Sequence, residues 1–560
     1  MTTPVDMVLE VRGLTVEYAG KPAMKSVDMT IGKGRIVGVV GESGSGKSTL
    51  ISAVIGLLPG SARITEGSIS FGGQDLARLA PNDFRDIRGR RISMVSQDPL
   101  SALNPVLTIG EHLMDIQFRE NIGASQKRGR AIEALKSVHM PDPESRLSMY
   151  PHELSGGQKQ RVSIAMAIMM KPELLIADEP TTALDATLEV EIIALLKELQ
   201  EDIGCAMIFV THHLGVVASL CDDVVVMYEG VVEESGTVRE VFHHPQSSYT
   251  SKLLRCDPAQ IAEKCRRLPT MNTPDEKMVE DEDSAKRRVA LDEEPILKIK
   301  DLVVKFRKPF GLSNFLDRSK PSEITAVDNV CLNLARGETL AIVGESGSGK
   351  TTLIRSILQL VSAQSGTIEF AGTSTLNTSR KSLRSIRRDI ALVFQDPIGS
   401  LSPRMTVGNC VREALRYGVA QPESERHEVE RLLTLVGLQG DFAQRYPHEL
   451  SGGQARRVCV ARALAQEPRM IIADEPTAGL DVSIQGEILN LLAELQDKLQ
   501  LPILIVTHNL NVVRHISDRM VIMLMGKIVE HGPTEEIFSN PQHDYTRRLL
   551  DSNNHPLPKM

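Results

Sequence analysis

Tryptophan is absent from the sequence, and aromatic residues make up only 3% of its 560 positions. Proteins that stack the bases of single-stranded nucleic acid need aromatic platforms, so this scarcity argues against such a function. The formal net charge of −8 at pH 7 also argues against a broad nucleic-acid-binding surface, although it leaves a local basic patch open.

Long apolar runs are missing as well. No run of about 18 apolar residues, the length a membrane-spanning helix needs, occurs in the sequence. The first residues have neither the basic region nor the apolar core of a signal peptide. We therefore expect neither a transmembrane segment nor a secreted protein.

Cysteine is sparse and irregularly placed. The seven cysteines lie at positions 205, 221, 256, 265, 331, 410 and 459, and no two of them form a Cys-x-x-Cys pair. An odd number at irregular spacing is not a disulfide framework, so we expect a reduced, cytosolic protein. With 41% hydrophobic and 24% charged residues, the chain has an ordinary soluble composition and the length for more than one core.

The sequence is rich in one feature, a glycine-rich loop between an apolar strand and a helix. Residues 36–40 predict a buried strand, and the residues after Lys47 predict a helix. Glycines allow successive N–H groups to turn toward an anion, and the helix dipole favours the same charge. The pattern predicts a phosphate-binding P-loop whose residues are Gly41, Glu42, Ser43, Gly44, Ser45, Gly46, Lys47, Ser48 and Thr49.

The P-loop recurs later in the chain, which excludes a chance Gly/Ser-rich loop. The second copy comprises Gly344, Glu345, Ser346, Gly347, Ser348, Gly349, Lys350, Thr351 and Thr352. Further motifs repeat at offsets that settle at 296 residues, because Tyr150 pairs with Tyr446 and His212 with His508. Residues 307–323 add length to an early loop of the second copy. A repeat this long indicates two tandem domains rather than a solenoid.

Each copy alternates apolar strands with amphipathic helices, for example a helical face at Ile484, Ile488 and Leu492 before a strand at residues 503–506. Such alternation predicts an α/β fold with a largely parallel sheet covered by helices on both faces. We predict one domain with a C-terminal tail at 7–268, a linker at 269–295 and a second domain at 296–555. Residues 271–294 carry nine acidic and four basic residues, which indicates a solvated acidic linker.

Two adjacent carboxylates follow a buried strand in each copy, Asp178 with Glu179 and Asp474 with Glu475. Because adjacent strand residues face opposite ways, we expect the two carboxylates to differ in role. The aspartate can hold Mg²⁺, and the glutamate can face an attacking water as general base. A solvated strand end would be the ordinary interpretation of an isolated acidic pair.

At this point the sequence resembles, twice over, the ATP-binding domains of ATP-binding-cassette (ABC) transporters. The most specific match is the family's signature, which is present as Ser155, Gly156, Gly157 and Gln158 and again as Ser451, Gly452, Gly453 and Gln454. A lone Ser-Gly-Gly is otherwise a plain helix N-cap. The resemblance implies two P-loop ATPase domains, each with a mainly parallel core sheet, an antiparallel β subdomain and a helical signature subdomain.

The resemblance also implies that the two domains pair head to tail and enclose two ATP molecules with Mg²⁺. Each site would then combine the Walker residues of one half with the signature of the other. The first site would use Lys47, Ser48, Gln97, Asp178, Glu179 and His212 with Ser451, Gly453 and the loop at Asp481. The second would use Lys350, Thr351, Gln395, Asp474, Glu475 and His508 with Ser155, Gly157 and the loop at Asp185.

Roles within these sites follow from the resemblance residue by residue. Glu179 and Glu475 would be catalytic, and His212 and His508 would contact the γ-phosphate. Tyr18 and Phe306 occupy the family's adenine-stacking position. The implied Mg²⁺ ligands are Ser48, Gln97 and Asp178 in one half and Thr351, Gln395 and Asp474 in the other.

Both halves keep every motif, so two hydrolysis-competent sites are expected. Three pairs of positions nevertheless differ between the copies or from the family. Met166 stands opposite Arg462, Gln160 opposite Arg456, and His213 opposite Asn509. These differences concern fine distinctions between the two sites.

Residues 98–105 and 396–403, with the segments 244–250 and 541–547, resemble the oligopeptide/dipeptide/nickel uptake branch of the family. Fused ATPases resemble its glutathione-type and microcin-type peptide importers. That resemblance implies two integral-membrane permease subunits, an extracytoplasmic solute-binding protein and a place on the cytoplasmic face of the bacterial inner membrane. The transported solute stays open.

Three other interpretations fit the sequence less well. A tandem cassette protein acting on ribosomes typically has a long basic linker, unlike the acidic segment here. A DNA-repair cassette ATPase would bring zinc-binding Cys pairs. Some relatives hold an iron–sulfur centre in the tail of the first domain, but Cys256 and Cys265 provide only two of four thiolates.

Overall fold

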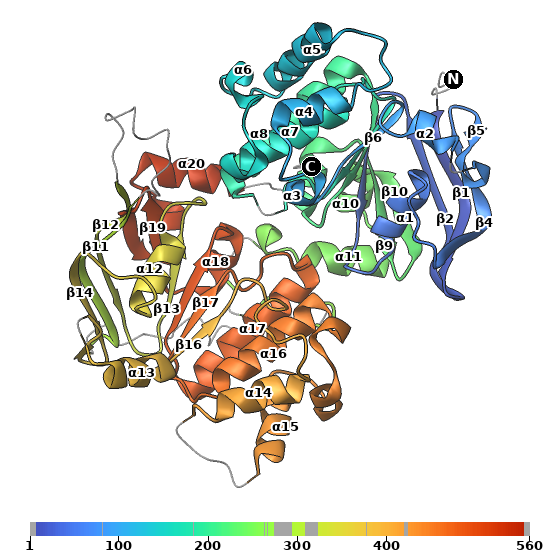
Figure 1. Cartoon of the computed structure of the whole chain (residues 1–560). Helices are drawn as coiled ribbons and strands as arrows, with labels where there is room; N and C mark the ends of the chain where they lie inside the picture. Colours follow the sequence, from blue (N-terminus) through green and yellow to red (C-terminus); the bar gives the residue numbers. More distant parts are fainter. Residues whose placement is uncertain are drawn as a thin grey trace. The chain divides into compact units, whose positions relative to one another are not determined.

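The computed structural model describes residues 7–80, 82–182, 184–261, 264–265, 267–273, 294–307, 323–376, 378–418 and 424–553. These residues divide into two compact units, one ending at Gln260 and one beginning at Ile261 (Figure 1). Residues 261, 264, 265, 267 and 268, which the sequence prediction placed in the tail of the first domain, cluster with the second unit. Residues 274–293 of the predicted linker at 269–295, and residues 308–322 of the predicted lengthened loop at 307–323, lie outside the described residues.

The first unit contains two sheets. An antiparallel sheet has the order β2-β1-β4-β5, and a six-stranded sheet has the order β10-β9-β3-β8-β7-β6. The six-stranded sheet is parallel except for β10, which pairs antiparallel with β9. The strands are β1 (Met7–Tyr18), β2 (Lys21–Gly32), β3 (Ile36–Val40), β4 (Ala62–Phe71), β5 (Gln74–Asp75), β6 (Ile92–Val95), β7 (Leu174–Asp178), β8 (Ala206–Val210), β9 (Asp223–Tyr228) and β10 (Val231–Thr237).

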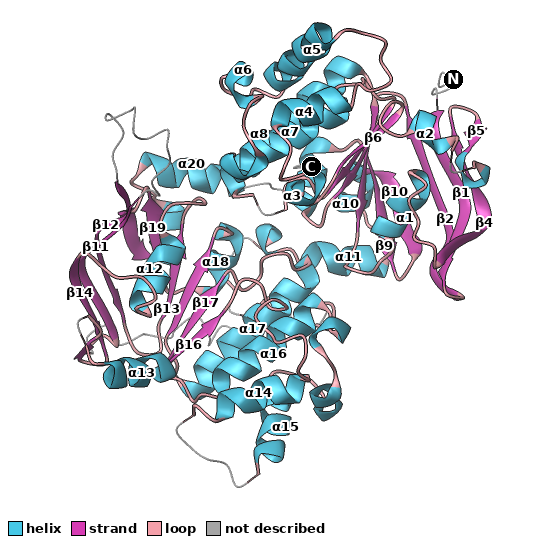
Figure 2. Ribbon diagram, viewed as in Figure 1, coloured by secondary structure: helices cyan, strands magenta, loops and turns pink. Residues whose placement is uncertain are grey.

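Helices cover this sheet, and Figure 2 shows them around the strands of each unit. They are α1 (Lys47–Val54), α2 (Phe84–Ile87), α3 (Pro99–Ala102), α4 (Ile109–Asp115), α5 (Ala124–Ser137), α6 (Pro143–Arg146), α7 (Gly156–Ile168), α8 (Ala186–Ile203), α9 (Leu214–Leu220), α10 (Val238–His243) and α11 (Ser248–Arg255). Short 3-10 helices span Leu76–Arg78, Pro151–Glu153 and Pro258–Gln260.

The core lies on both faces of the parallel sheet because strand residues alternate between two hydrophobic clusters. In β7, Leu175 and Ala177 pack with the helices that include α5, α7 and α8. Their neighbours Leu174 and Ile176 pack on the opposite face with α1 and the antiparallel sheet. Burial on both faces explains the continuous apolar runs in the sequence.

The second unit repeats this architecture with sheet orders β12-β11-β14-β15 and β16-β17-β18-β13-β19-β20. Its strands are β11 (Leu297–Arg307), β12 (Glu323–Leu334), β13 (Thr339–Val343), β14 (Ser365–Phe370), β15 (Thr373–Ser374), β16 (Ile390–Val393), β17 (Met470–Asp474), β18 (Ile503–Thr507), β19 (Arg519–Leu524) and β20 (Lys527–Pro533). Its helices are α12 (Lys350–Ile357), α13 (Arg380–Asp389), α14 (Val407–Leu415), α15 (Glu425–Leu435), α16 (Gly452–Leu464), α17 (Val482–Leu499), α18 (Leu510–Ile516), α19 (Thr534–Ser539) and α20 (Asp544–Asn553), with 3-10 helices at Gly440–Gln444 and Pro447–Glu449.

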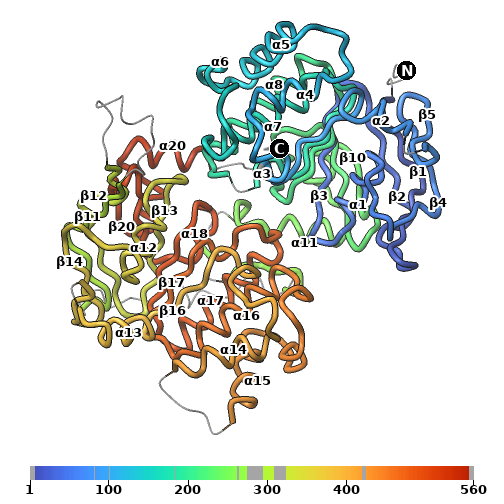
Figure 3. The backbone as a smooth tube through the Cα atoms, viewed as in Figure 1, coloured from blue at the N-terminus to red at the C-terminus, as the bar shows by residue number. Residues whose placement is uncertain are grey.

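The predicted fold class is confirmed in both halves. Each P-loop strand lies in the middle of its parallel sheet, because β3 pairs with β8 and β9, and β13 with β18 and β19 (Figure 3). The carboxyl ends of these strands meet at one edge, which is where ligands bind in open α/β sheets. Among the helices in the described ranges, none has both the length and the apolar character to cross a bilayer.

Candidate functional site

The first P-loop begins where β3 ends. Gly41 has φ of 150°, and a Cβ there would lie only 2.1 Å from the Met227 carbonyl oxygen, so a side chain cannot fit. Gly46, with φ of 104°, is the N-cap of α1, which starts at Lys47. Gly344 and Gly349 repeat this geometry before α12, with φ of 158° and 104°.

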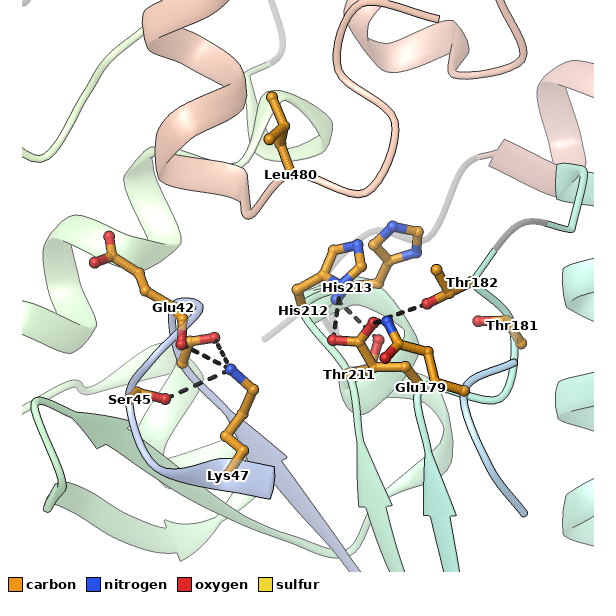
Figure 4. A network of polar contacts seen from close by, with 12 residues as sticks. Glu42, Ser45, Lys47, Glu179, Thr181, Thr182, Thr211, His212, His213 and Leu480 are labelled. Carbon is orange, nitrogen blue, oxygen red and sulfur yellow. Dashed lines mark hydrogen bonds and ion pairs between the residues drawn. The ribbon is translucent and has the colours of Figure 1, made fainter. Parts of the chain in front are cut away.

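The P-loop lysine is buried against its own loop. Lys47 is 7% exposed, and its Nζ donates hydrogen bonds to the carbonyl oxygens of Gly41 at 2.7 Å and Glu42 at 2.8 Å (Figure 4). Lys350 does the same with Gly344 at 2.6 Å and Glu345 at 2.8 Å. The ammonium is thereby held within the loop whose N–H groups favour an anion.

Asp178 and Glu179, at the end of β7, differ in backbone conformation, and this difference does not come from the strand alternation that the sequence suggested. Strand β7 ends at Asp178, and Glu179 has a left-handed backbone with φ of 45°. The alternation of a regular strand therefore does not apply to Glu179. Its N–H donates to the Val210 carbonyl oxygen at 2.9 Å, which fixes the turn, and Glu475 has the same conformation with φ of 49°.

The two carboxylates also differ in pKa. Burial and then the neighbouring charge of Glu179 outweigh the opposing effect of Lys47, and together they raise the pKa of Asp178 to about 6. Burial would also raise the pKa of Glu179, but hydrogen bonds and the charge of His212, with Thr182 and Lys47, outweigh it and lower that pKa to about 2. In the second half, burial and the charge of Glu475 raise the pKa of Asp474.

Glu179 is the centre of a polar network drawn in Figure 4. Its Oε2 accepts hydrogen bonds from Gln97 Nε2 at 2.8 Å and from Thr182 Oγ1 at 2.9 Å. His212 Nδ1 lies 3.5 Å from Oε1. In the second half, His508 Nδ1 lies 2.9 Å from Glu475 Oε1. The structure therefore brings together the sequence-predicted glutamate and histidine in both halves.

Thr182 was missed by the sequence analysis, although it lies three residues after Glu179. Thr181 and Glu189, the second of which contacts the His213 already singled out in the sequence, were missed as well. Glu189 Oε1 accepts from Thr181 Oγ1 at 2.8 Å and lies 3.0 Å from His213 Nδ1. Thr181 and Thr182, which closely follow Asp178 and Glu179 in the sequence, are the signal that could have pointed to the threonine contacts with Glu189 and Glu179.

Each signature serine begins a helix. Ser155 is the N-cap of α7, and its hydroxyl accepts from Gln158 N at 3.4 Å while Gln158 Oε1 accepts from Ser155 N at 3.2 Å. Ser451 and Gln454 form the same capping box on α16, at 3.3 and 3.0 Å. Ser155, Gly156, Ser451 and Gly452 are exposed, whereas Gly157 and Gly453 are buried, and both helix N-termini offer backbone donors and a helix dipole to an anion.

The remaining predicted residues lie near their strand and helix ends. Ser48 and Thr351 are exposed in the first turns of α1 and α12. Tyr18 ends β1 with its hydroxyl 3.4 Å from Thr49 Oγ1, and Phe306, in β11, is 41% exposed. Gln395 follows β16, and Asp185 and Asp481 are the N-caps of α8 and α17.

The family model of the ABC transporter matches the chain at residues 24–182 and again at 327–478. That of the oligopeptide/dipeptide transporter C-terminal region matches residues 529–559. Both matches fall on the halves and motifs described above.

Full-length relatives agree with these matches. The glutathione import ATP-binding protein GsiA of Salmonella paratyphi A is 41% identical over 97% of this chain and 89% of its own length. GsiA of Escherichia coli K12 is 42% identical over 94% of this chain and 86% of its own. The solved structure of cbiO1 from Clostridium perfringens is 32% identical with a TM-score of 0.39, covering 44% of this chain and 92% of that one. The chain therefore belongs to the ABC transporter family, as a single polypeptide carrying two of its ATP-binding domains.

Proposed function

We propose that this chain is the ATP-hydrolysing subunit of an importer for glutathione or other short peptides. The observation that carries the proposal is that each half has a P-loop lysine held in its loop and a glutamate paired with a histidine, Glu179 partly buried and Glu475 buried. The GsiA relatives, which are named as glutathione import proteins and match this chain over 94–97% of its length, support the proposed class of transported solute.

The residues of the first half divide the chemistry among them. Lys47 and the P-loop N–H groups hold the triphosphate, while Glu179, kept ionised by its low pKa, accepts a proton from the attacking water. His212 and Gln97 hold that carboxylate from two sides and orient it. In the second half, His508 holds Glu475 in the same way.

Oxygen ligands suited to Mg²⁺ are available beside the P-loop. The hydroxyl of Ser48, the amide oxygen of Gln97 and the carboxylate of Asp178 are the hard donors that this ion prefers. The raised pKa of Asp178 reports a buried carboxylate whose ionisation a cation would favour. Bound there, Mg²⁺ would neutralise charge on the β- and γ-phosphates; Thr351, Gln395 and Asp474 would be its ligands in the second half.

Transport requires partners that this chain does not provide. We propose that the two domains pair head to tail around ATP, so that Ser451 completes the first site and Ser155 the second. Closure would be transmitted to two integral-membrane permease subunits, at the cytoplasmic face of the bacterial inner membrane, which receive solute from an extracytoplasmic binding protein.

The test is to co-express the tagged chain with two candidate permease subunits of a glutathione or peptide importer and to reconstitute the purified complex in vesicles. We expect uptake of labelled glutathione or short peptides that depends on ATP and is lost in a Glu179→Gln/Glu475→Gln variant. Recovery of the chain with ribosomes, and not with permeases, would reverse the assignment.

A further inference from the structure

A short segment at the start of the second unit, residues 264–265 and 267–273, packs on the helices α17 and α18. Both helices directly follow functional loops, since α17 begins after Asp481 and α18 begins two residues after His508. We name residues 264–265 and 267–273 the strap. The strap connects the last helix of the first unit to the second unit along the chain.

The central contact of the strap is a pair of hydrogen bonds to one amide side chain. Leu268 N donates to Asn490 Oδ1 at 2.8 Å, and Asn490 Nδ2 donates to the Leu268 carbonyl oxygen at 2.8 Å. A side-chain amide that satisfies both backbone groups of one residue replaces the pairing of a β-ladder.

Two further polar contacts fix the strap to α18. Cys265 N lies 3.1 Å from Nδ1 of His515, a side chain that is only 2% exposed. Lys264 Nζ donates to the carbonyl oxygen of Ser517, the C-cap of α18, at 2.7 Å. A cation at this end of a helix is also favoured by the helix dipole.

Apolar packing completes the contact. Leu268 is 3% exposed and forms a cluster with Leu489 of α17 and Val512 of α18. Gly486 lets the strap approach α17, because a Cβ at that position would lie 3.0 Å from the Pro269 carbonyl oxygen.

The first half lacks the groove that receives the strap. At the constant offset of 296 residues, Asn490, Gly486 and His515 correspond to Ala194, Val190 and Ser219. Ala194 is exposed on α8, whereas Asn490 is half-buried beneath the strap. The replacements therefore remove the amide, the space for the strap backbone and the imidazole together.

We propose that the strap is a docking element specific to the second half, which holds α17 against α18 and so positions the Asp481 and His508 loops. Its docking follows from the contacts alone, and its effect on hydrolysis rests on the proposed function. Asn490 and Gly486 are positioning residues in this proposal, because neither touches the reacting groups.

The test uses the full chain and the substitutions that the first half already carries on the same helix. Asn490→Ala removes both bonds to Leu268, and Gly486→Val pushes the strap from α17. In either variant we expect trypsin to cleave after Lys264 and Arg267 about tenfold faster than in the wild type. The cleavage rate follows the fraction of molecules in which the strap is undocked, and weakening the contact between the strap and α17 raises that fraction. Ala194→Asn, which introduces the amide on α8, should leave the cleavage rate unchanged.

Hydrolysis is then measured in a Glu179→Gln background, where the second site provides the turnover. We expect Asn490→Ala to lower kcat about threefold or more with the KM for ATP unchanged, because the P-loop is intact and only loop positioning is lost. Unchanged proteolysis in both variants overturns the docking element; faster proteolysis with unchanged kcat overturns its positioning role. If the wild-type chain hydrolyses no ATP, the proposed function fails, and the proteolysis result still decides the docking.

Discussion

Glu179 and Glu475 both hold a left-handed backbone, with φ of 45° and 49°. A conformation of this kind costs a non-glycine residue about 1–3 kcal/mol and persists only where surrounding contacts impose it. The contacts here are the N–H bonds to Val210 and Val506 on the neighbouring strands. Strain repeated at the same position of both halves favours a functional requirement for the direction of these carboxylates.

The first prediction concerns this carboxylate. Glu179→Gln with Glu475→Gln keeps the size and the backbone while removing the proton acceptor. We expect turnover to fall by about 100-fold or more, the usual contribution of a general base, with ATP affinity retained. Steady-state phosphate release and calorimetric titration measure the two quantities.

Lys47→Ala with Lys350→Ala is the matched contrast, because it removes the phosphate contact and leaves the base. We expect ATP affinity to fall in that variant. Normal turnover in the glutamine variant, or normal affinity in the alanine variant, would contradict the roles assigned to these side chains.

His213 carries a charge that its counterpart Asn509 cannot. Burial lowers the pKa of His213, but the charge and hydrogen bond of Glu189, with Asp257 and Glu179, outweigh this and raise it to about 9. Its ring also packs edge-on against His212, with centroids 4.5 Å apart. The second half has Gln485 in place of Glu189, so the ion pair is confined to the first half.

The second prediction is a pH dependence of stability that follows from this ion pair. The pKa of His213 is about 9 in the folded protein, above its value of about 6.5 in the unfolded chain. The ion pair therefore contributes its full stabilisation below pH 6.5, and this stabilisation is lost as the pH rises through about 9. The melting temperature of the wild type should therefore exceed that of His213→Asn at pH 6 and converge with it above pH 9. Asn509→His, in the half where Gln485 replaces Glu189, is the control and should show no such pH-dependent gain. A constant difference for His213→Asn from pH 6 to 10 would contradict the pairing.

At the scale of elements, Arg456 joins the signature helix to two loops of the second half. It lies on the signature helix α16 and is 1% exposed. Its guanidinium donates to the carbonyl oxygen of Phe394, just before Gln395, at 2.7 Å, and to that of Ala478, just before the Asp481 loop, at 3.3 Å. In the first half the shorter Gln160 occupies this position.

The third prediction is that Arg456→Leu destabilises the second domain. The partly buried hydrogen bonds to the carbonyl oxygens of Phe394 and Ala478 are lost at about 1–3 kcal/mol each, so we expect a loss of about 2–6 kcal/mol in the free energy of unfolding of that domain. Urea unfolding followed by hydrogen exchange of the second domain measures the loss. Arg456→Gln introduces the residue that the first half has at this position, and it should lower the free energy of unfolding by less. If the leucine variant is as stable as the wild type, the two hydrogen bonds of Arg456 do not stabilise the domain.

Elements of this kind mark what sequence could and could not predict. The strands and helices were predictable because β3, β7 and β8 are buried on both faces and read as continuous apolar runs. The P-loop, the paired carboxylates at Asp178 and Asp474, and the histidines His212 and His508 could be picked out because each recurs in the second copy. The strap was not, since Asn490 and His515 look like ordinary polar residues on helices until the chain from Lys264 is placed against them. Nor was the turn at Glu179, because positive φ at a glutamate has no sequence signal.

At the scale of the whole molecule, the duplication keeps both sets of catalytic groups while altering their support. His508 lies 2.9 Å from its glutamate, whereas His212 lies 3.5 Å from its own. The strap and Arg456 belong to the second half, and the His213–Glu189 pair to the first. We infer that the two halves hydrolyse ATP by the same chemistry and differ in how their loops are held.

The last prediction tests the proposed head-to-tail pairing through additivity. Two substitutions within one ATP site remove only the turnover of that site. Two substitutions in different sites remove the turnover of both sites. If Ser451 completes the site of Glu179, then Ser451→Arg with Glu179→Gln should retain the turnover of the second site, about that of Glu179→Gln alone. Ser451→Arg with Glu475→Gln should abolish steady-state hydrolysis, and Ser155→Arg should show the reverse pattern. Each combination is measured as phosphate release at saturating ATP, with equal melting temperatures as the control for folding. If instead Ser451→Arg abolishes hydrolysis together with Glu179→Gln and spares it together with Glu475→Gln, each signature serves the P-loop of its own half, and head-to-tail pairing is wrong.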